Sequence, residues 1–160
     1  MTFLFAAGSS LVFASSLAAA SSVVSGKRKR IRHTEAILGL FSHVRSNIEY
    51  FLTPVDGIFA DFRNDALESC GFSRVLRESG IDAAVRSNTA SFSPQTGELL
   101  LSFSSSLGKG YKEEQLRLCD YYREKVSEEL ERERESLKRN LPAYRYAPPV
   151  FALFIILCFI

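Results

Sequence analysis

Two stretches of the chain carry no charged residue, and they lie near its two ends. The first runs from residue 2 to 26 and the second from residue 147 to 160. A helix rises about 1.5 Å per residue, so roughly 20 apolar residues cross the hydrocarbon core of a membrane. The first stretch has that length. The second is more apolar but shorter than the usual span, so whether it crosses fully stays open. We predict that both are membrane segments.

The middle of the chain repeats its apolar residues at helical spacing. The pattern predicts a first long helix from about Arg30 to Phe51. Thr53 and Pro54 suit the N-cap and first position of a second helix. That helix would bury Val55, Ile58, Phe59 and Phe62.

The later helices are predicted from apolar runs and helix-breaking residues. We expect short helices over 64–91, broken at Gly71 and Gly80, and a further helix that starts at Ser93 and ends at Gly108. A last long helix begins near Glu113, and its apolar stripe thins after residue 130. The fold class predicted is all-α: a bundle of about five to six helices over 30–143, flanked by the two membrane segments.

Basic residues gather directly beside the apolar stretches, although the net charge of the whole chain is only +2. Lys and Arg flank the cytoplasmic ends of membrane helices, so we expect the middle of the chain in the cytoplasm. A nucleic-acid patch is the alternative, but the position of the basic residues favours anionic lipid, and no nucleic-acid partner is expected. The run that follows the first stretch, called the basic run below, consists of Lys27, Arg28, Lys29, Arg30 and Arg32.

A cleaved signal peptide is a competing interpretation of the first stretch. Residues 18–20 are three alanines and fit a cleavage site. However, no Lys or Arg precedes the apolar residues, and the basic run follows them, which is the reverse of a signal peptide. A retained anchor is therefore favoured.

The sequence contains no motif that carries catalytic chemistry. Its three cysteines are widely spaced, which indicates reduced thiols rather than a metal site. His33 and Glu35 match half of a zinc-deaminase motif whose cysteine half is absent, and residues 108–110 lack the spacing of a phosphate-binding loop. We expect no enzyme activity, no metal and no cofactor.

The order of these features resembles the stage III sporulation protein AB family. The basic run reads R-x-R-x-R, the first long helix ends in I-x-Y-x-x-T-P, and L-G-x-x-x-x-x-x-Q follows between the two apolar stretches. The chain departs from the family at Tyr111, where an Asp is usual, and over 64–91, which has no clear match. The resemblance singles out six candidate structural or interaction residues, namely Tyr50, Thr53, Pro54, Leu107, Gly108 and Gln115. Helix capping by Thr53, Pro54 and Gly108 is the simpler explanation of their presence.

The resemblance implies a non-catalytic role in the cell membrane, on the mother-cell side during sporulation. Members belong to the channel between mother cell and forespore, and their cytoplasmic domain is similar to the helical domain of type II secretion platform proteins. Implied partners are membrane lipid, other channel proteins and a cytoplasmic ATPase, stage III sporulation protein AA. The alternative is a lipid-bound regulator or sensor that uses the basic run on anionic lipid.

Overall fold

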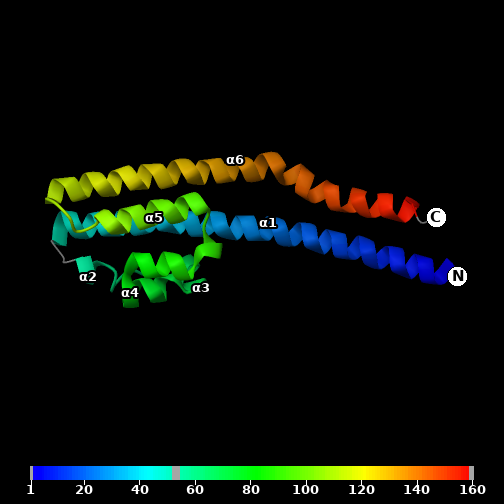
Figure 1. Ribbon diagram of the computed structural model, residues 1–160, viewed down its shortest axis with the longest axis horizontal. Helices are drawn as coiled ribbons and strands as arrows, with labels where there is room; N and C mark the ends of the chain where they lie inside the picture. The colour runs from blue at the N-terminus through cyan, green and yellow to red at the C-terminus, as the bar shows by residue number, and fades with distance from the viewer. Residues whose placement is uncertain (1, 52–54, 159–160) are drawn as a thin grey trace. The chain divides into compact units, whose positions relative to one another are not determined.

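The computed structural model describes the backbone of residues 2–51 and 55–158, and the side chains of residues 21–50, 57–143 and 150. Over these residues the chain is helical and contains no strand, which confirms the predicted all-α class. The elements are α1 (Thr2–Ser46), a π-helical turn (Asn47–Phe51), α2 (Val55–Ile58), α3 (Asp65–Ser69), α4 (Phe72–Ser87), a 3-10 turn (Thr89–Ser91), α5 (Pro94–Ser106) and α6 (Lys112–Cys158) (Figure 1).

The chain divides into two compact units. One comprises Lys29–Glu133 and is called the bundle below; the other comprises the residues up to Arg28 together with those from Arg134 onward. The membrane roles predicted for 2–26 and 147–160 stay predictions. In the part of the chain that the structure describes, no helix is both long and apolar enough to cross a membrane.

The two longest helices, α1 and α6, extend beyond the boundaries predicted from the sequence. The first apolar stretch and the first bundle helix were expected as separate elements, but α1 is one helix from Thr2 to Ser46. The second uncharged stretch was expected as a separate segment from residue 147, but α6 continues through it to Cys158. Residues 148 and 149 of α6 are prolines, which lack the backbone donor of a helix interior, although their fixed φ of about −65° is itself a helical value.

The core of the bundle is built on the apolar face of α1. Ile37, Phe41 and Val44 are fully buried there, as the helical spacing predicts. Phe41 meets Phe103 of α5 edge to face, with ring centroids 4.8 Å apart. Phe103 in turn packs on Tyr122 of α6, at 5.6 Å. These contacts hold α1, α5 and α6 side by side.

The predicted second helix is shorter than expected. Ile58, Phe59 and Phe62 are buried as expected, but α2 ends at Ile58 and the last two lie outside a helix. The ring Nε2 of His43 bonds the Ile58 carbonyl oxygen at 2.8 Å, so that carbonyl has a partner other than a following helical N–H. Thr53 and Pro54 lie outside the described residues.

The glycine breaks agree with the sequence. Gly71 precedes α4 with φ 80°, and Gly80 interrupts α4 with φ 79° and ψ −178°. The hydroxyl of Ser93 accepts from the backbone N–H of Thr96 and so caps α5. Both predicted breaks and the predicted start of α5 are confirmed.

Candidate functional site

Gln115 organises the connection between α5 and α6. It lies in the first turns of α6 with only 7% of its surface exposed. Its Oε1 accepts from the N–H of Gly108 at 2.9 Å, and its Nε2 donates to the carbonyls of Ser106, at 3.4 Å, and Lys109. Gly108 has φ 80°, in the left-handed region that favours glycine. The L-G-to-Q spacing therefore has a local structural reason: the glutamine bonds the turn that the glycine permits.

The same turn is bonded to the end of the first helix. The ammonium of Lys112 donates to the carbonyl of Glu49 in the π-helical turn, at 2.6 Å. One turn earlier, Arg45 pairs with Glu49 and, at 3.0 Å, with Asp120 of α6. The two segments are far apart in sequence but adjacent in space. Together, Asn47–Tyr50 and Leu107–Lys112 are called the tip below.

Two tyrosines stand out from the tip. Tyr50 is 72% exposed and Tyr111 is 78% exposed, and they are the chain neighbours of Glu49 and Lys112, the two bonded residues. The N–H of Tyr111 is held by the carboxylate of Glu114 at 3.1 Å. The backbone is thus fixed while the rings face solvent.

The basic run spans the residue at which the bundle begins: Lys27 and Arg28 precede the bundle, and the other three residues of the run belong to it. Arg28, Lys29 and Arg32 are exposed, whereas Lys27 and Arg30 are half-buried. At 1.5 Å per residue, Arg30 and Tyr50 are roughly 30 Å apart along the first helix. The sequence-predicted residues are therefore not one site: Tyr50, Leu107, Gly108 and Gln115 belong to the tip, and the basic run does not.

A polar cluster lies beside the basic run. His33 Nδ1 bonds the carbonyl of Ser91 at 3.2 Å, and the Thr34 hydroxyl donates to Glu133 at 3.4 Å. Burial is the main cause that lowers the pKa of His33, and the charges of nearby Lys29 and Arg32 act in the same direction. Burial is also the main cause that raises the pKa of Glu133. Both groups are therefore held toward their neutral forms.

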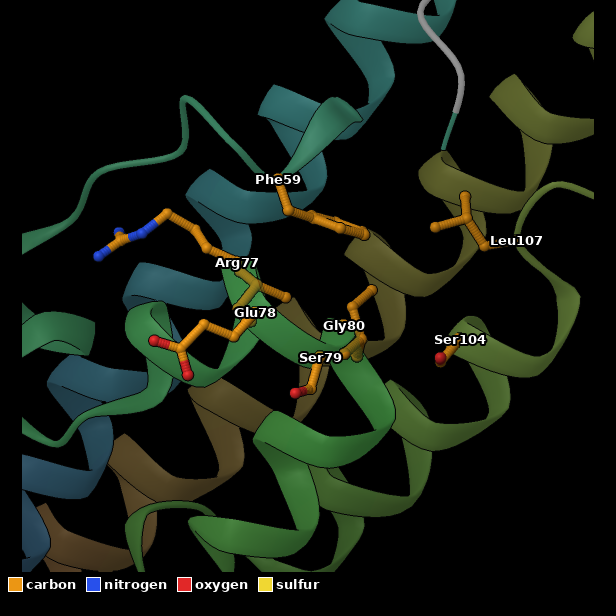
Figure 2. Close-up of a pocket in the computed structure, with 9 residues that line it drawn as sticks. Phe59, Arg77, Glu78, Ser79, Gly80, Ser104 and Leu107 are labelled. Atoms are coloured by element: carbon orange, nitrogen blue, oxygen red, sulfur yellow. The ribbon is translucent and has the colours of Figure 1, made fainter. Parts of the chain in front are cut away.

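A cavity of about 420 Å³ opens between α4, α5 and the turn that follows α2 (Figure 2). Its apolar lining includes Leu107, which the sequence singled out, together with Phe59 and Leu76. Arg77 at its edge is already engaged, since its guanidinium donates to the Phe62 carbonyl and pairs with Glu68, both at 3.3 Å. The remaining lining residues are Glu78, Ser79, Gly80, Ile81 and Ser104.

The described part of the chain gives little support for a metal site or for a nucleophilic cysteine. No group of three or more His, Cys, Asp or Glu side chains is placed there to hold a metal ion. Cys119 is 1% exposed, and burial, reinforced by the charge of Asp120, raises the pKa of its thiol to about 11. A thiol in that state is a core residue rather than a nucleophile, as its position on the apolar stripe predicts.

Sequence reasoning missed the contacts that join the two parts of the tip. Arg45 and Glu49 stand four residues apart on a helix, a spacing that indicates an ion pair. Nothing in the sequence signals that Lys112 reaches the Glu49 carbonyl, because that contact depends on how α1 and α6 pack.

Fold and tip together define a small helical-bundle protein with a braced turn between α5 and α6. A comparison with family models matches residues 6–160 to stage III sporulation protein AB, and the chain belongs to that family. Its role is therefore related to sporulation, and the family is not a known enzyme family. Neither curated proteins nor solved structures give a match.

Proposed function

We propose that this protein is a non-catalytic membrane scaffold of the channel between mother cell and forespore. It seats a cytoplasmic ATPase, stage III sporulation protein AA, beneath that channel. Membership of the family supports a sporulation role, and the likeness of the family to secretion platform proteins supports the docking of an ATPase. Other channel proteins and membrane lipid are the further partners.

One observation carries the proposal: α1 is a single uninterrupted helix. It contains the uncharged stretch 2–26, then the basic run, and then the fully buried core residues Ile37 and Phe41. A helix that is uncharged at one end and forms the bundle core at the other suits a protein that fixes a domain to a membrane.

The exposed members of the basic run suit the lipid surface. Arg28, Lys29 and Arg32 are available to anionic headgroups, and each contributes about 1 kcal/mol of attraction near such a surface. In this proposal 2–26 and 147–160 lie in the membrane, and Lys29–Glu133 faces the mother-cell cytoplasm.

A lipid-bound regulator or sensor is the second candidate function. The same exposed cations favour it, together with the polar cluster of His33 and Glu133 that lies next to them. It differs from the scaffold in needing no ATPase and no channel partners.

Co-purification from sporulating cells separates the two functions. An affinity tag is inserted in the 64–91 region at Thr89–Ala90, two exposed residues between α4 and α5, and an untagged strain is the control. The scaffold predicts recovery of the ATPase and other channel proteins with the tagged chain. Recovery of lipid without those proteins would contradict the scaffold function and favour the regulator function.

A further inference from the structure

We infer that Glu129 and Glu133 form a proton-dependent contact between α6, α1 and the start of α5. The contact is closed while the two carboxyl groups hold a proton, and it loosens when both are ionised. This inference needs neither the ATPase nor the channel, so it stands apart from the proposed function. All the residues that carry it belong to the bundle, Lys29–Glu133.

The two carboxyl groups lie on one face of α6 and contact two other elements. Residues four apart on a helix are neighbours on its surface, as Glu129 and Glu133 are. The Thr34 hydroxyl of α1 donates to Glu133 at 3.4 Å. The hydroxyl of Ser93, the N-cap of α5, donates to Glu129 at 3.4 Å and is also hydrogen-bonded to Glu133. One hydroxyl group therefore contacts both carboxyl groups.

Water has little access to these groups. Thr34 is fully buried and Ser93 is 7% exposed. The side chain of Glu129 is 12% exposed, and Glu133 is half-buried. Two like charges in such a place are poorly hydrated and repel each other. The bundle therefore disfavours the state in which both carboxyl groups are ionised.

The hydroxyl of Ser93 cannot satisfy all of its acceptors at once. It has one hydrogen, and three acceptors are within reach: Thr96 Oγ1 at 3.0 Å, Glu129 Oε1 and the carboxyl group of Glu133. An ionised carboxylate only accepts hydrogen bonds, whereas a protonated carboxyl group also donates one. A proton on the pair therefore adds the donor that the group of acceptors lacks.

Bonds and cations near the pair oppose this effect without cancelling it. Burial is the main cause that raises the pKa of Glu133, and the charge of Glu129 is the second. The charge of Arg30 and the bonds from the Thr34 and Ser93 hydroxyls act in the other direction and are outweighed. Arg132 of α6 lies 3.6 Å from Glu129 but is 71% exposed, and ion pairs with an exposed partner contribute little.

The raised pKa of Glu133 gives the pH range in which the contact changes. Because this pKa is higher in the folded bundle than the ordinary 4.5, the folded chain takes up the proton first as the pH falls. The stabilisation by the pair is therefore complete below pH 4.5 and is lost as the pH rises through the folded pKa. His33, which the charges of Lys29 and Arg32 act on, responds in the opposite direction.

The test measures hydrogen–deuterium exchange over residues 126–137 by mass spectrometry, with the full chain in detergent micelles. Glu133→Gln and Glu129→Gln each replace one carboxyl group by a neutral group of nearly the same size. At pH 7.5 we expect exchange in this segment to be about three- to tenfold slower in each variant than in the unaltered chain, because one of the two like charges is gone. At pH 4.5 we expect the difference to disappear.

Glu124→Gln is the matched control. Glu124 is exposed on the same helix, so its replacement changes the net charge equally without touching the pair. We expect exchange in the segment to change by less than about twofold at either pH. His33 is present in every protein compared, so its titration cancels at each pH. Helical content by circular dichroism checks that each variant folds.

Three outcomes would overturn the inference. Equal exchange in the unaltered chain and both pair variants at pH 7.5 would show that the pair does not control the contact. Faster exchange in the pair variants would show that Arg30 and Arg132 hold two ionised carboxylates in stabilising ion pairs. Equal slowing in Glu124→Gln would assign the effect to net charge. None of these results bears on the docking of the ATPase.

Discussion

At the scale of single residues, the buried side-chain amide of Gln115 bonds the backbone of the connection between α5 and α6. Gln115→Ala removes the acceptor for the Gly108 N–H and the donor to the Lys109 carbonyl. Gly108 and Lys109 are exposed, so water can replace the amide, and we expect the free energy of unfolding to fall by the net worth of one ordinary hydrogen bond, about 0.5–1.5 kcal/mol. Gln95→Ala is the control, because Gln95 is exposed on α5 and its loss should cost less than about 0.5 kcal/mol.

Cys119 offers a direct measure of that loss. It is buried in the bundle core and reacts with an alkylating reagent only when the bundle opens. Urea titration of the full chain in micelles, with Cys70 and Cys158 replaced by Ser, reports unfolding through labelling of this one thiol. If Gln115→Ala and Gln95→Ala have the same urea midpoint, the bonds of Gln115 contribute nothing to stability.

His33 makes the stability of the bundle depend on pH. Because burial lowers its pKa in the folded bundle below the ordinary 6.5, the unfolded chain takes up a proton first as the pH falls. The His33 contribution is therefore complete above pH 6.5 and is lost below it. We expect the urea midpoint to drop more between pH 7.5 and 5.5 in the unaltered chain than in His33→Gln.

Glutamine is chosen so that the two proteins differ mainly in whether residue 33 titrates. Its amide can still donate to the Ser91 carbonyl, but it does not titrate. Glu133, whose raised pKa acts in the opposite direction as the pH changes, is present in both proteins and so cancels. Equal changes in the midpoint of both proteins would contradict the role given to His33.

At the scale of elements, the break in α4 depends on the backbone of Gly80. A Cβ at this position meets no atom within 4 Å, so the cost of Gly80→Ala is conformational, from φ 79° and ψ −178°. Such backbone costs an L-residue about 1–3 kcal/mol, and we expect unfolding to become easier by that amount. Urea titration with Cys119 labelling measures it.

Gly39→Ala is the matched control and should change stability in the other direction. Gly39 lies within α1, is not among the glycines with positive φ, and also has open space around a Cβ. Alanine in a helix interior is favoured over glycine by about 1 kcal/mol. Destabilisation of similar size in both variants would show that the α4 break is not a matter of backbone conformation.

The elements that the sequence predicts well are those with a local cause. The buried face of α1, the breaks at Gly71 and Gly80 and the cap at Ser93 follow from spacing and side-chain chemistry within a few residues. The early end of α2 was missed because its last carbonyl is bonded by His43, which belongs to another helix. Local patterns cannot show a contact of that kind.

The residues of the tip also separate into those that the sequence singled out and those that only long-range packing brings in. Gln115 and Gly108 were singled out by the family resemblance, and the structure places them in one turn, where the two are bonded. Lys112, which joins that turn to Glu49, was missed because the contact spans much of the chain. The sequence therefore predicts the parts of the tip, and only packing brings them together.

At the scale of the whole molecule, the two long helices connect the compact units. α1 and α6 both extend from the bundle into the unit that contains the uncharged stretches. No loop separates the bundle from those stretches in the described residues. In the proposed scaffold, the bundle is therefore joined to the uncharged stretches by helix rather than by loop.

The proposed topology predicts which side of the membrane each part of the chain can be labelled from. Ser105→Cys places a thiol at an exposed position of α5, and Thr2→Cys places one at the start of the first uncharged stretch. Both are made with Cys70 and Cys158 replaced by Ser. Cys119 stays in place, because burial and a pKa of about 11 keep it unreactive in the folded bundle.

We expect a membrane-impermeant maleimide to label Thr2→Cys in intact protoplasts and Ser105→Cys only after the membrane is opened. The physical reason is the basic run, whose cations are retained on the cytoplasmic side and so fix the orientation of the stretch before them. Labelling of Ser105→Cys in intact protoplasts would place the bundle outside the cytoplasm. A cytoplasmic ATPase could not then reach the bundle, which would contradict the scaffold proposal.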